Sequence, residues 1–307
     1  MSVRMASHAG SWYPSDANEL KKLLDRLLGG ASVVSSQIAL RAIVAPHGGY
    51  RYSGQTAAWS YKSLNRAVVK RVFILGPCHH VYVDGCALPA AEITHYSTPL
   101  GDLELDLAVI HQLRTLAGMK TFTLENDLEE HSIEMQLPFL KYMLGSVKIV
   151  PIYVGSIAQN EESVFGQYLS NYIDNPETLF VISSDFCHWG HRFRFTPQAA
   201  PAAASAPLVY PLLSANGKIE ALDRVGMDLI VAQDVHGFFK YCQSTGNTIC
   251  GKNGLLILME TLRQAKNRCD INFVHYSQSG LLPQEPTRED SCVSYAAGLC
   301  VQVVRTE

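Results

Sequence analysis

Histidines that follow three apolar runs are the side chains of this sequence best placed to do chemistry. The first run, residues 72–75 (VFIL), ends at Gly76 and Pro77, and His79 follows. An apolar run of this length and composition predicts a fully buried strand. Because open α/β sheets place their ligand crevices at the carboxyl ends of strands, we expect a site at this position.

His47 occupies a similar position after a second apolar run. Residues 42–45 (AIVA) predict another buried strand, Pro46 ends it, and Gly48 and Gly49 let the backbone turn sharply beside the imidazole. A single histidine after a strand is usually structural. Two such histidines favour a shared site when one connection joins their strands, and residues 54–65 predict a helix in that connection.

A third apolar run, residues 179–182 (LFVI), is followed by Asp185 and His188. A carboxylate three residues from a histidine can fix the tautomer of the ring and hold it as a general acid or base. Asp185 could instead cap a turn through its side chain. We favour catalysis by His188 and Asp185, because this would be the third strand to bring an imidazole to the same edge of the sheet.

His131 and Glu134 lie in a segment, residues 126–140, that predicts a helix. Three residues apart on a helix, they would face the same way. Such a pair can bind a metal or orient another ligand. The alternative is a helix N-terminus in which the neighbouring acidic residues complement the dipole.

Trp12 and His80 are two further pocket candidates. Trp12 lies in a segment of small and aromatic residues, 7–14, which is either a lid packed on the body of the protein or a contact to a ligand. His80 follows His79 directly, and adjacent residues on an extended loop usually point apart.

Cys250 lies in a loop, NTICG, just before a helix predicted over residues 255–265. The positive end of a helix lowers the pKa of a thiol and favours the metal-binding thiolate. A lone cysteine in this setting is more often inert. The eight cysteines are scattered without a CxxC pair, so we expect reduced thiols and neither a disulfide framework nor a zinc knuckle.

The composition bounds the class of protein. A chain of 307 residues with 47% hydrophobic content can bury a large core. Its formal charge of -3 and the lack of a dense Lys/Arg run argue against a nucleic-acid partner. Neither a signal peptide nor a bilayer-spanning stretch is visible, so we expect no membrane insertion and a cytoplasmic location.

The other elements complete the predicted fold. Asp16 is positioned to cap a leucine-rich helix that ends at Gly29 and Gly30. The Ala/Pro-rich residues 196–211 predict a mobile surface insertion. We expect one α/β domain over residues 1–307, with a central mixed β-sheet flanked by helices. Its remaining predicted elements are helices over residues 102–116, 219–231 and 235–242 and strands over 148–154, 271–276 and 291–304.

Six motifs, in order, carry a resemblance to a known family: APHGGY, ILGPCHH, EEHSIEMQLPF, SSDFCHWG, NTICG and VSYAAG. Together they resemble the Memo family (mediator of ErbB-driven cell motility). The fold of that family is similar to the LigB-type class III extradiol dioxygenases, which use non-haem iron. The similarity runs from SHAGSWYP to VSYAAG, and the Ala/Pro-rich insertion is its main departure.

The resemblance implies a pocket in which His47, His79 and Cys250 bind redox-active iron or copper, with His188 and Asp185 lining it. In the dioxygenase relatives, the positions similar to His47 and His79 are iron ligands and the one similar to His188 is the acid/base. In those relatives a glutamate occupies the position of the third ligand, at which this chain has Cys250, and this difference argues against ring cleavage. The implied function is a metal-binding redox protein that handles reactive oxygen in cell motility or cytoskeletal signalling.

Two other functions remain open. The resemblance also implies an adaptor that recognises phosphotyrosine peptides of receptor tails, with Trp12 and the histidines forming the binding wall. The other is hydrolysis by zinc, because two imidazoles and a thiolate are also a catalytic zinc set, although this soft combination suits copper as well. We expect iron or copper ahead of zinc.

Overall fold

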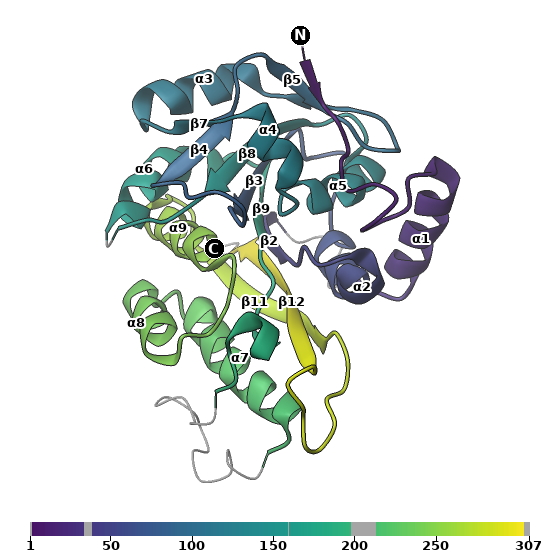
Figure 1. Ribbon diagram of the computed structural model, residues 1–307. Coiled ribbons are helices and arrows are strands. Elements are labelled where there is room, and N and C mark those ends of the chain that lie inside the picture. The colour runs from purple at the N-terminus through teal and green to yellow at the C-terminus, as the bar shows by residue number, and fades with distance from the viewer. Residues whose placement is uncertain (1, 34–38, 159, 198–212, 304–307) are drawn as a thin grey trace.

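The computed structural model describes residues 2–33, 39–158, 160–197 and 213–303 (Figure 1). Within these residues the strands form one 12-stranded mixed sheet, and helices cover both of its faces. The predicted α/β class with a central mixed sheet flanked by helices is therefore confirmed.

Four parallel strands form the centre of the sheet. In spatial order they are β8 (Lys148–Val154), β3 (Arg71–Pro77), β9 (Thr178–Ser183) and β2 (Leu40–Ala45). Nearly all of their residues are buried, because helices cover both faces, and this is why their sequences are continuous apolar runs.

Antiparallel and short strands extend this centre. The sheet continues from β2 through two long antiparallel strands, β12 (Ser291–Gln302) and β11 (Cys269–Gln278). The short strands are β1 (Ser2–Arg4), β4 (Cys86–Pro89), β5 (Ile93–Tyr96), β6 (Leu103–Leu105), β7 (Lys120–Phe122) and β10 (His188–Gly190).

Helices pack on the two faces in separate groups (Figure 1). One group holds α1 (Ala17–Gly29), α2 (Tyr50–Tyr61) and α5 (Leu137–Leu144), and the other holds α6 (Glu161–Ile173) and α9 (Lys252–Gln264). Near β11 and β12 lie α7 (Ala215–Val231) and α8 (Val235–Thr245). The shorter helical elements are α3 (Leu107–Leu116), α4 (Leu124–Glu129), η1 (Glu134–Gln136) and η2 (His191–Phe193).

The first helix forms as its sequence predicts. The Asp16 carboxylate accepts hydrogen bonds from the main-chain N–H groups of Asn18 and Glu19, both at 2.9 Å. This is the N-cap contact expected from an aspartate at that position. The leucines at positions 20, 24, 27 and 28 are buried against the core.

The single helix predicted over residues 126–140 is wrong. The α4 helix ends at Glu129, and Glu130 has an extended backbone (φ −84°, ψ 129°). The Glu130 carboxylate accepts hydrogen bonds from the main-chain N–H groups of His131 and Ser132 at 2.9 Å. These amides are thereby bound to a side chain instead of continuing the helix.

Other differences lie at element boundaries. The helix predicted over residues 54–65 begins at Tyr50 and ends at Tyr61, and that predicted over residues 102–116 is a strand, β6, followed by α3. The predicted insertion, residues 196–211, falls almost wholly on residues 198–212, outside the described part of the chain. Among the described helices, none has both the length and the apolar content needed to cross a bilayer.

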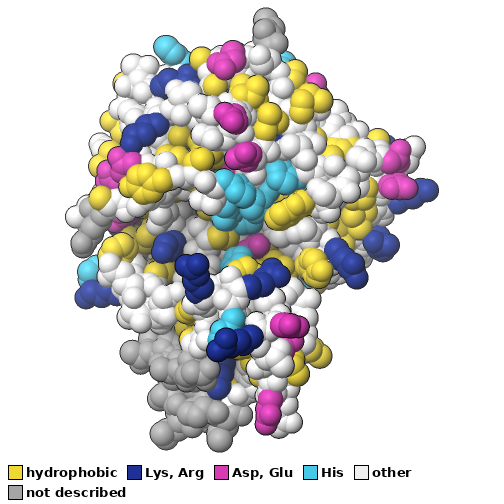
Figure 2. Space-filling view, in the orientation of Figure 1, with side chains coloured by type: hydrophobic (Ala, Val, Ile, Leu, Met, Phe, Trp, Pro, Cys, Tyr) yellow, Lys and Arg dark blue, Asp and Glu magenta, His cyan; other side chains and the backbone are white. Residues whose placement is uncertain are grey.

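Histidine side chains gather near the centre of one face of the molecule (Figure 2). His47 and His79 follow β2 and β3 closely, which places them at the carboxyl ends of these central strands. Acidic and basic side chains are spread over the rest of this face (Figure 2).

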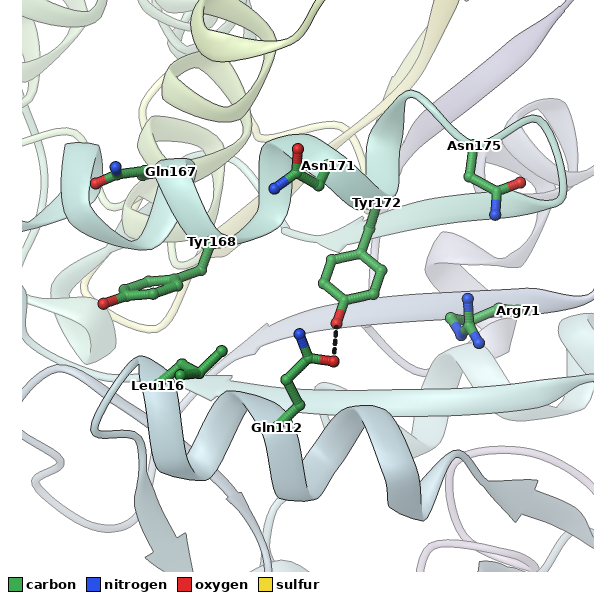
Figure 3. Close-up of a pocket in the computed structure, with 8 residues that line it drawn as sticks. All are labelled: Arg71, Gln112, Leu116, Gln167, Tyr168, Asn171, Tyr172 and Asn175. Carbon is green, nitrogen blue, oxygen red and sulfur yellow. Dashed lines mark hydrogen bonds between the residues drawn. The ribbon is translucent and has the colours of Figure 1, made fainter.

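A separate cavity of about 600 Å³ lies near the opposite, amino end of β3 (Figure 3). Residues of α3 and α6 face each other across it, and the Tyr172 hydroxyl donates a hydrogen bond to Gln112 at 3.0 Å. Its lining residues are Arg71, Gln112, Leu116, Gln167, Tyr168, Asn171, Tyr172 and Asn175. None of these is a histidine, cysteine or carboxylate, so the cavity offers no customary metal donor.

Candidate metal centre

Parallel pairing brings the predicted site residues to one edge of the sheet. His47, His79 and Asp185 each lie two residues beyond the end of a central strand, namely β2, β3 and β9. Because β9 pairs with both β2 and β3, the three loops that follow these strands are neighbours. The predicted convergence at the carboxyl edge is therefore found in the fold.

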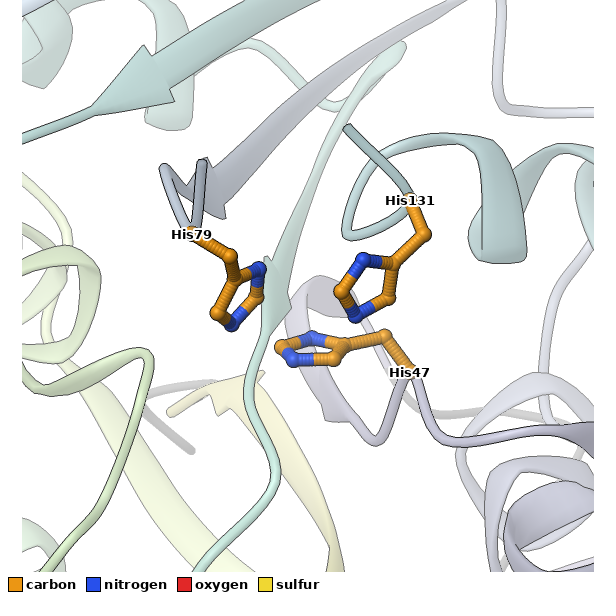
Figure 4. A group of neighbouring side chains, drawn as sticks. All are labelled: His47, His79 and His131. Atoms are coloured by element: carbon orange, nitrogen blue, oxygen red, sulfur yellow. The ribbon is translucent and has the colours of Figure 1, made fainter. Parts of the chain in front are cut away.

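Three imidazoles form the core of the site (Figure 4). One ring nitrogen from each of His47, His79 and His131 lies within 4.8 Å of the other two. Two nitrogens bound to the same zinc-like ion can be at most about 4.2 Å apart, since each bond is about 2.1 Å long. The observed spacing thus needs a shift of less than about 1 Å to hold one ion.

The charge state of His47 and His131 also fits a metal. Burial, together with the neighbouring imidazoles, lowers the pKa of His131 to about 3. Burial likewise holds the pKa of His47 well below its usual range, and His79 acts in the same direction. Both rings are neutral near pH 7, so each keeps an unprotonated nitrogen that can bind a metal ion.

The tautomer of His47 follows from its hydrogen bonds. The Ser183 hydroxyl donates to the Ser132 carbonyl at 2.7 Å, so it must accept from His47 Nδ1, which lies 2.8 Å away. The proton of the neutral ring is therefore on Nδ1. Nε2 is left as the free nitrogen, and it faces the Cys250 sulfur at 3.1 Å.

Cys250, the predicted third ligand, lies outside this three-imidazole group and contacts it through His47, while His131 takes the third place. Its sulfur also accepts a hydrogen bond from the main-chain N–H of Asp185 at 3.1 Å. The prediction that the helix end lowers the pKa of this thiol is wrong for the metal-free chain. Burial raises the pKa well above its usual range, and the nearby Asp185 carboxylate adds to the effect.

His188 lines the cavity, but Asp185 does not fix its tautomer. His188 Nδ1 lies 2.9 Å from the Phe186 carbonyl and 3.1 Å from the Thr248 carbonyl. Carbonyls only accept, so Nδ1 carries the hydrogen and Nε2 of the neutral ring is free. The predicted contact between the two side chains is thus replaced by main-chain contacts.

Asp185 instead holds the His47 loop. Its Oδ1 accepts from the main-chain N–H groups of His47 at 2.8 Å and Gly48 at 3.2 Å. Burial raises the pKa of this carboxyl even though these N–H groups and His188 favour its charged form. An added Cβ at Gly48 would lie 3.1 Å from the Tyr295 ring, so a larger residue would have to displace that ring by a few tenths of an ångström.

A cavity of about 580 Å³ opens in front of these groups. Trp12 lines it, with its ring centroid 4.4 Å from that of His131, so the predicted lid segment contributes a wall of the site. Further aromatic walls and one cation come from residues that the sequence interpretation did not single out: Tyr52, Arg192, Phe193 and Tyr295. Arg192 and Phe193 follow the SSDFCHWG motif closely, and Tyr295 lies within VSYAAG, which is the signal that could have found them.

Two pocket candidates lie away from the cavity lining. His80 is exposed, and its ring centroid is 6.2 Å from that of His131. Glu134 is buried and bonded to Arg4, to His8 at 2.8 Å and to Tyr13 at 2.7 Å. The expectation that Glu134 and His131 face the same way on one helix is therefore wrong, because this segment is not helical between α4 and η1.

Comparisons with known proteins show which family this chain belongs to. A family model described as "Memo-like protein" matches residues 4–299. The chain belongs to the Memo family. Among curated relatives, Protein MEMO1 of Xenopus laevis is 41% identical over 305 residues, covering 97% of each chain. Protein MEMO1 of Homo sapiens is 38% identical, covering 96% of each chain, and the memo-1 homolog of Caenorhabditis elegans is 39% identical, covering 97% of this chain and 82% of its own.

A solved structure of an uncharacterized Escherichia coli K12 protein shares 15% identity with this Memo-family chain. It aligns with a TM-score of 0.47 over 83% of this chain and 98% of its own. This likeness is too slight to support an argument about the site.

Proposed function

We propose that this Memo-family chain is a redox protein that binds iron or copper. The metal would be held by His47 and His79, with His131 as a third imidazole and Cys250 as a sulfur donor. The observation that carries the proposal is the approach of three imidazole nitrogens to within 4.8 Å of one another, beside a thiol. When bound, such a metal supplies one-electron chemistry.

The donor set admits a redox metal. Imidazoles suit iron, copper and zinc alike, and a thiolate adds a soft ligand that suits copper as well as zinc, so the choice of iron or copper follows the family resemblance. Cys250 would bind as the thiolate, so metal binding has to release its proton. This coupling predicts weaker metal binding at low pH.

His188 and Asp185 would serve the same cavity in different ways. The free Nε2 of His188 can accept or return a proton at the substrate, since Nδ1 is occupied by carbonyls. Asp185 would keep the His47 loop in place through main-chain N–H groups. The proposed setting is the handling of reactive oxygen in cell motility or cytoskeletal signalling, as the family resemblance implies. The proposed location is the cytoplasm.

Metal analysis tests the proposal. The wild-type chain, His79→Ala and Cys250→Ala would be purified anaerobically and analysed for iron, copper and zinc. We expect a redox metal in the wild type and its loss in both variants. Asn171→Ala, in the separate cavity near the amino end of β3, is the control that should keep the metal. Unchanged metal content in both site variants, or colourless and spin-silent zinc in the wild type, would refute the proposal.

The walls of the cavity favour a second candidate function. Trp12, Tyr52, Phe193 and Tyr295 offer aromatic faces, and Arg192 offers a cation, a combination that suits a phosphotyrosine side chain. In this alternative the chain is a peptide-binding adaptor. Calorimetry with a phosphotyrosine peptide, with and without chelator, separates the two functions, because an adaptor binds equally well in both.

A further inference from the structure

Glu130 connects the two loops that carry His79 and His131. Its side chain is only 1% exposed, and it lies between the end of α4 and His131. Hydrogen bonds to the carboxylate compensate for the burial of this charged side chain.

The Glu130 carboxylate binds both the main chain and the ring of His79. Oε2 accepts from the His79 N–H at 2.6 Å, and Oε1 lies 2.9 Å from His79 Nδ1. Oε1 also accepts from the N–H groups of His131 and Ser132, each at 2.9 Å. Main-chain N–H groups only donate, so both carboxylate oxygens act as acceptors.

These contacts set the tautomer of His79. Because the facing oxygen is an acceptor, the neutral form of the His79 ring carries its proton on Nδ1, and Nε2 of that form is unprotonated. A carboxylate behind a metal-bound histidine fixes the ring orientation in this way and increases the basicity of the ring. The same carboxylate holds the backbone of His131, so it places two of the three imidazoles together.

We propose that Glu130 is a positioning residue for the metal centre, which presents His79 Nε2 and the His131 loop to a bound ion. This inference rests on the proposed metal-binding function. It goes beyond that function because it names the side chain that prepares the donors before any ion is bound.

Two contacts besides those of the Glu130 side chain also hold this loop. The Ser132 hydroxyl donates to the Pro77 carbonyl at 2.8 Å, and Arg4 Nη2 donates to the Glu130 carbonyl at 3.0 Å. Neither contact uses the Glu130 side chain. A substitution there should therefore change the ligand geometry more than the fold.

The experiment uses Glu130→Gln in the full chain. A carboxamide has the same shape, but its NH₂ group must face one of the N–H donors and cannot accept from it. We expect the affinity for iron or copper, titrated as the metal alone, to fall about 10- to 100-fold. Glu129→Gln changes the exposed neighbouring residue and should leave the affinity unchanged.

A second readout does not depend on the metal. In the metal-free wild type, the ¹⁵N chemical shifts of His79 should report the Nδ1–H tautomer, and Glu130→Gln should shift the ring toward a mixture of tautomers. A purely structural role would leave the tautomer of the folded variant unchanged. If the wild type binds no metal, the proposed function fails while the tautomer still tests Glu130.

Two results would overturn the inference. One is wild-type metal affinity in Glu130→Gln together with an unchanged His79 tautomer. The other is an Nε2–H tautomer of His79 in the metal-free wild type, which decides the matter even if the variant does not fold.

Discussion

Asp223 should make the protein less stable as the pH rises from acid toward neutral. It lies on α7 and is fully buried. Two groups donate hydrogen bonds to the Asp223 carboxylate: Asn247 Nδ2 at 3.0 Å and the Tyr276 hydroxyl at 2.8 Å. Burial nevertheless outweighs these donors and raises the pKa of Asp223 from 3.8 to about 6.

The direction and size of the effect follow from proton linkage. Between these two pKa values the folded chain holds the proton that the unfolded chain has released, so the free energy of unfolding falls as the pH rises. The pKa difference is about 2 units, and each unit corresponds to 1.36 kcal/mol, which gives a total of about 3 kcal/mol. Below pH 3.8 and above about pH 6, Asp223 does not make the free energy of unfolding change with pH.

Asp223→Asn removes the titrating group while keeping its size. The free energy of unfolding would be measured by urea denaturation of the metal-free protein at a series of pH values. The free energy of unfolding of the variant, relative to that of the wild type, should increase by about 3 kcal/mol between about pH 3 and pH 7.5. Asp228→Asn, which changes an exposed carboxylate of the same helix, should give a profile parallel to the wild type. A parallel profile for Asp223→Asn as well would refute the reasoning.

Two further substitutions test the packing around the site. Arg4 is 1% exposed and its guanidinium binds the carboxylates of Asp127 and Glu134, so Arg4→Ala takes the guanidinium away from two buried carboxylates. We expect Arg4→Ala to lower the free energy of unfolding by about 3–5 kcal/mol. The control Arg268→Ala, whose wild-type side chain is 80% exposed, should lower it by less than about 1 kcal/mol. Equal losses of both variants in urea denaturation would contradict this. In Gly251→Ala the new Cβ would lie 2.4 Å from Ser184 Cβ and should cost about 1–3 kcal/mol in the same assay. The matched change Gly29→Ala, where nothing lies within 4 Å, should be neutral or slightly stabilising, and a similar loss in both would show that crowding is not the cause.

The sequence predicted the parts of the fold that depend on local patterns. The central strands are buried on both faces, so their apolar runs were visible directly. The positions of His47 and His79 just beyond two such strands were enough to predict that they meet. The α1 helix was predictable because its cap, Asp16, and its leucine face are both local features.

The parts that the sequence did not predict depend on distant contacts. Residues 126–140 have a helical pattern, but Glu130 binds His79, which is 51 residues away, and interrupts the helix. Arg4 would be expected on the surface, yet its carboxylate partners are 123 and 130 residues away. The pKa of Cys250 was predicted in the wrong direction because burial, which dominates it, cannot be seen from a helix boundary.

The short reach from each central strand to its site residue has a consequence for how an ion would enter. Only one residue separates the end of β2 from His47 and the end of β3 from His79, so these side chains have little freedom to move apart. The entropy of arranging the donors is lost when the chain folds, and little remains to be lost on association. The empty and loaded forms should therefore superimpose closely, and the speed of uptake should be set by access through the cavity rather than by rearrangement of the sheet edge.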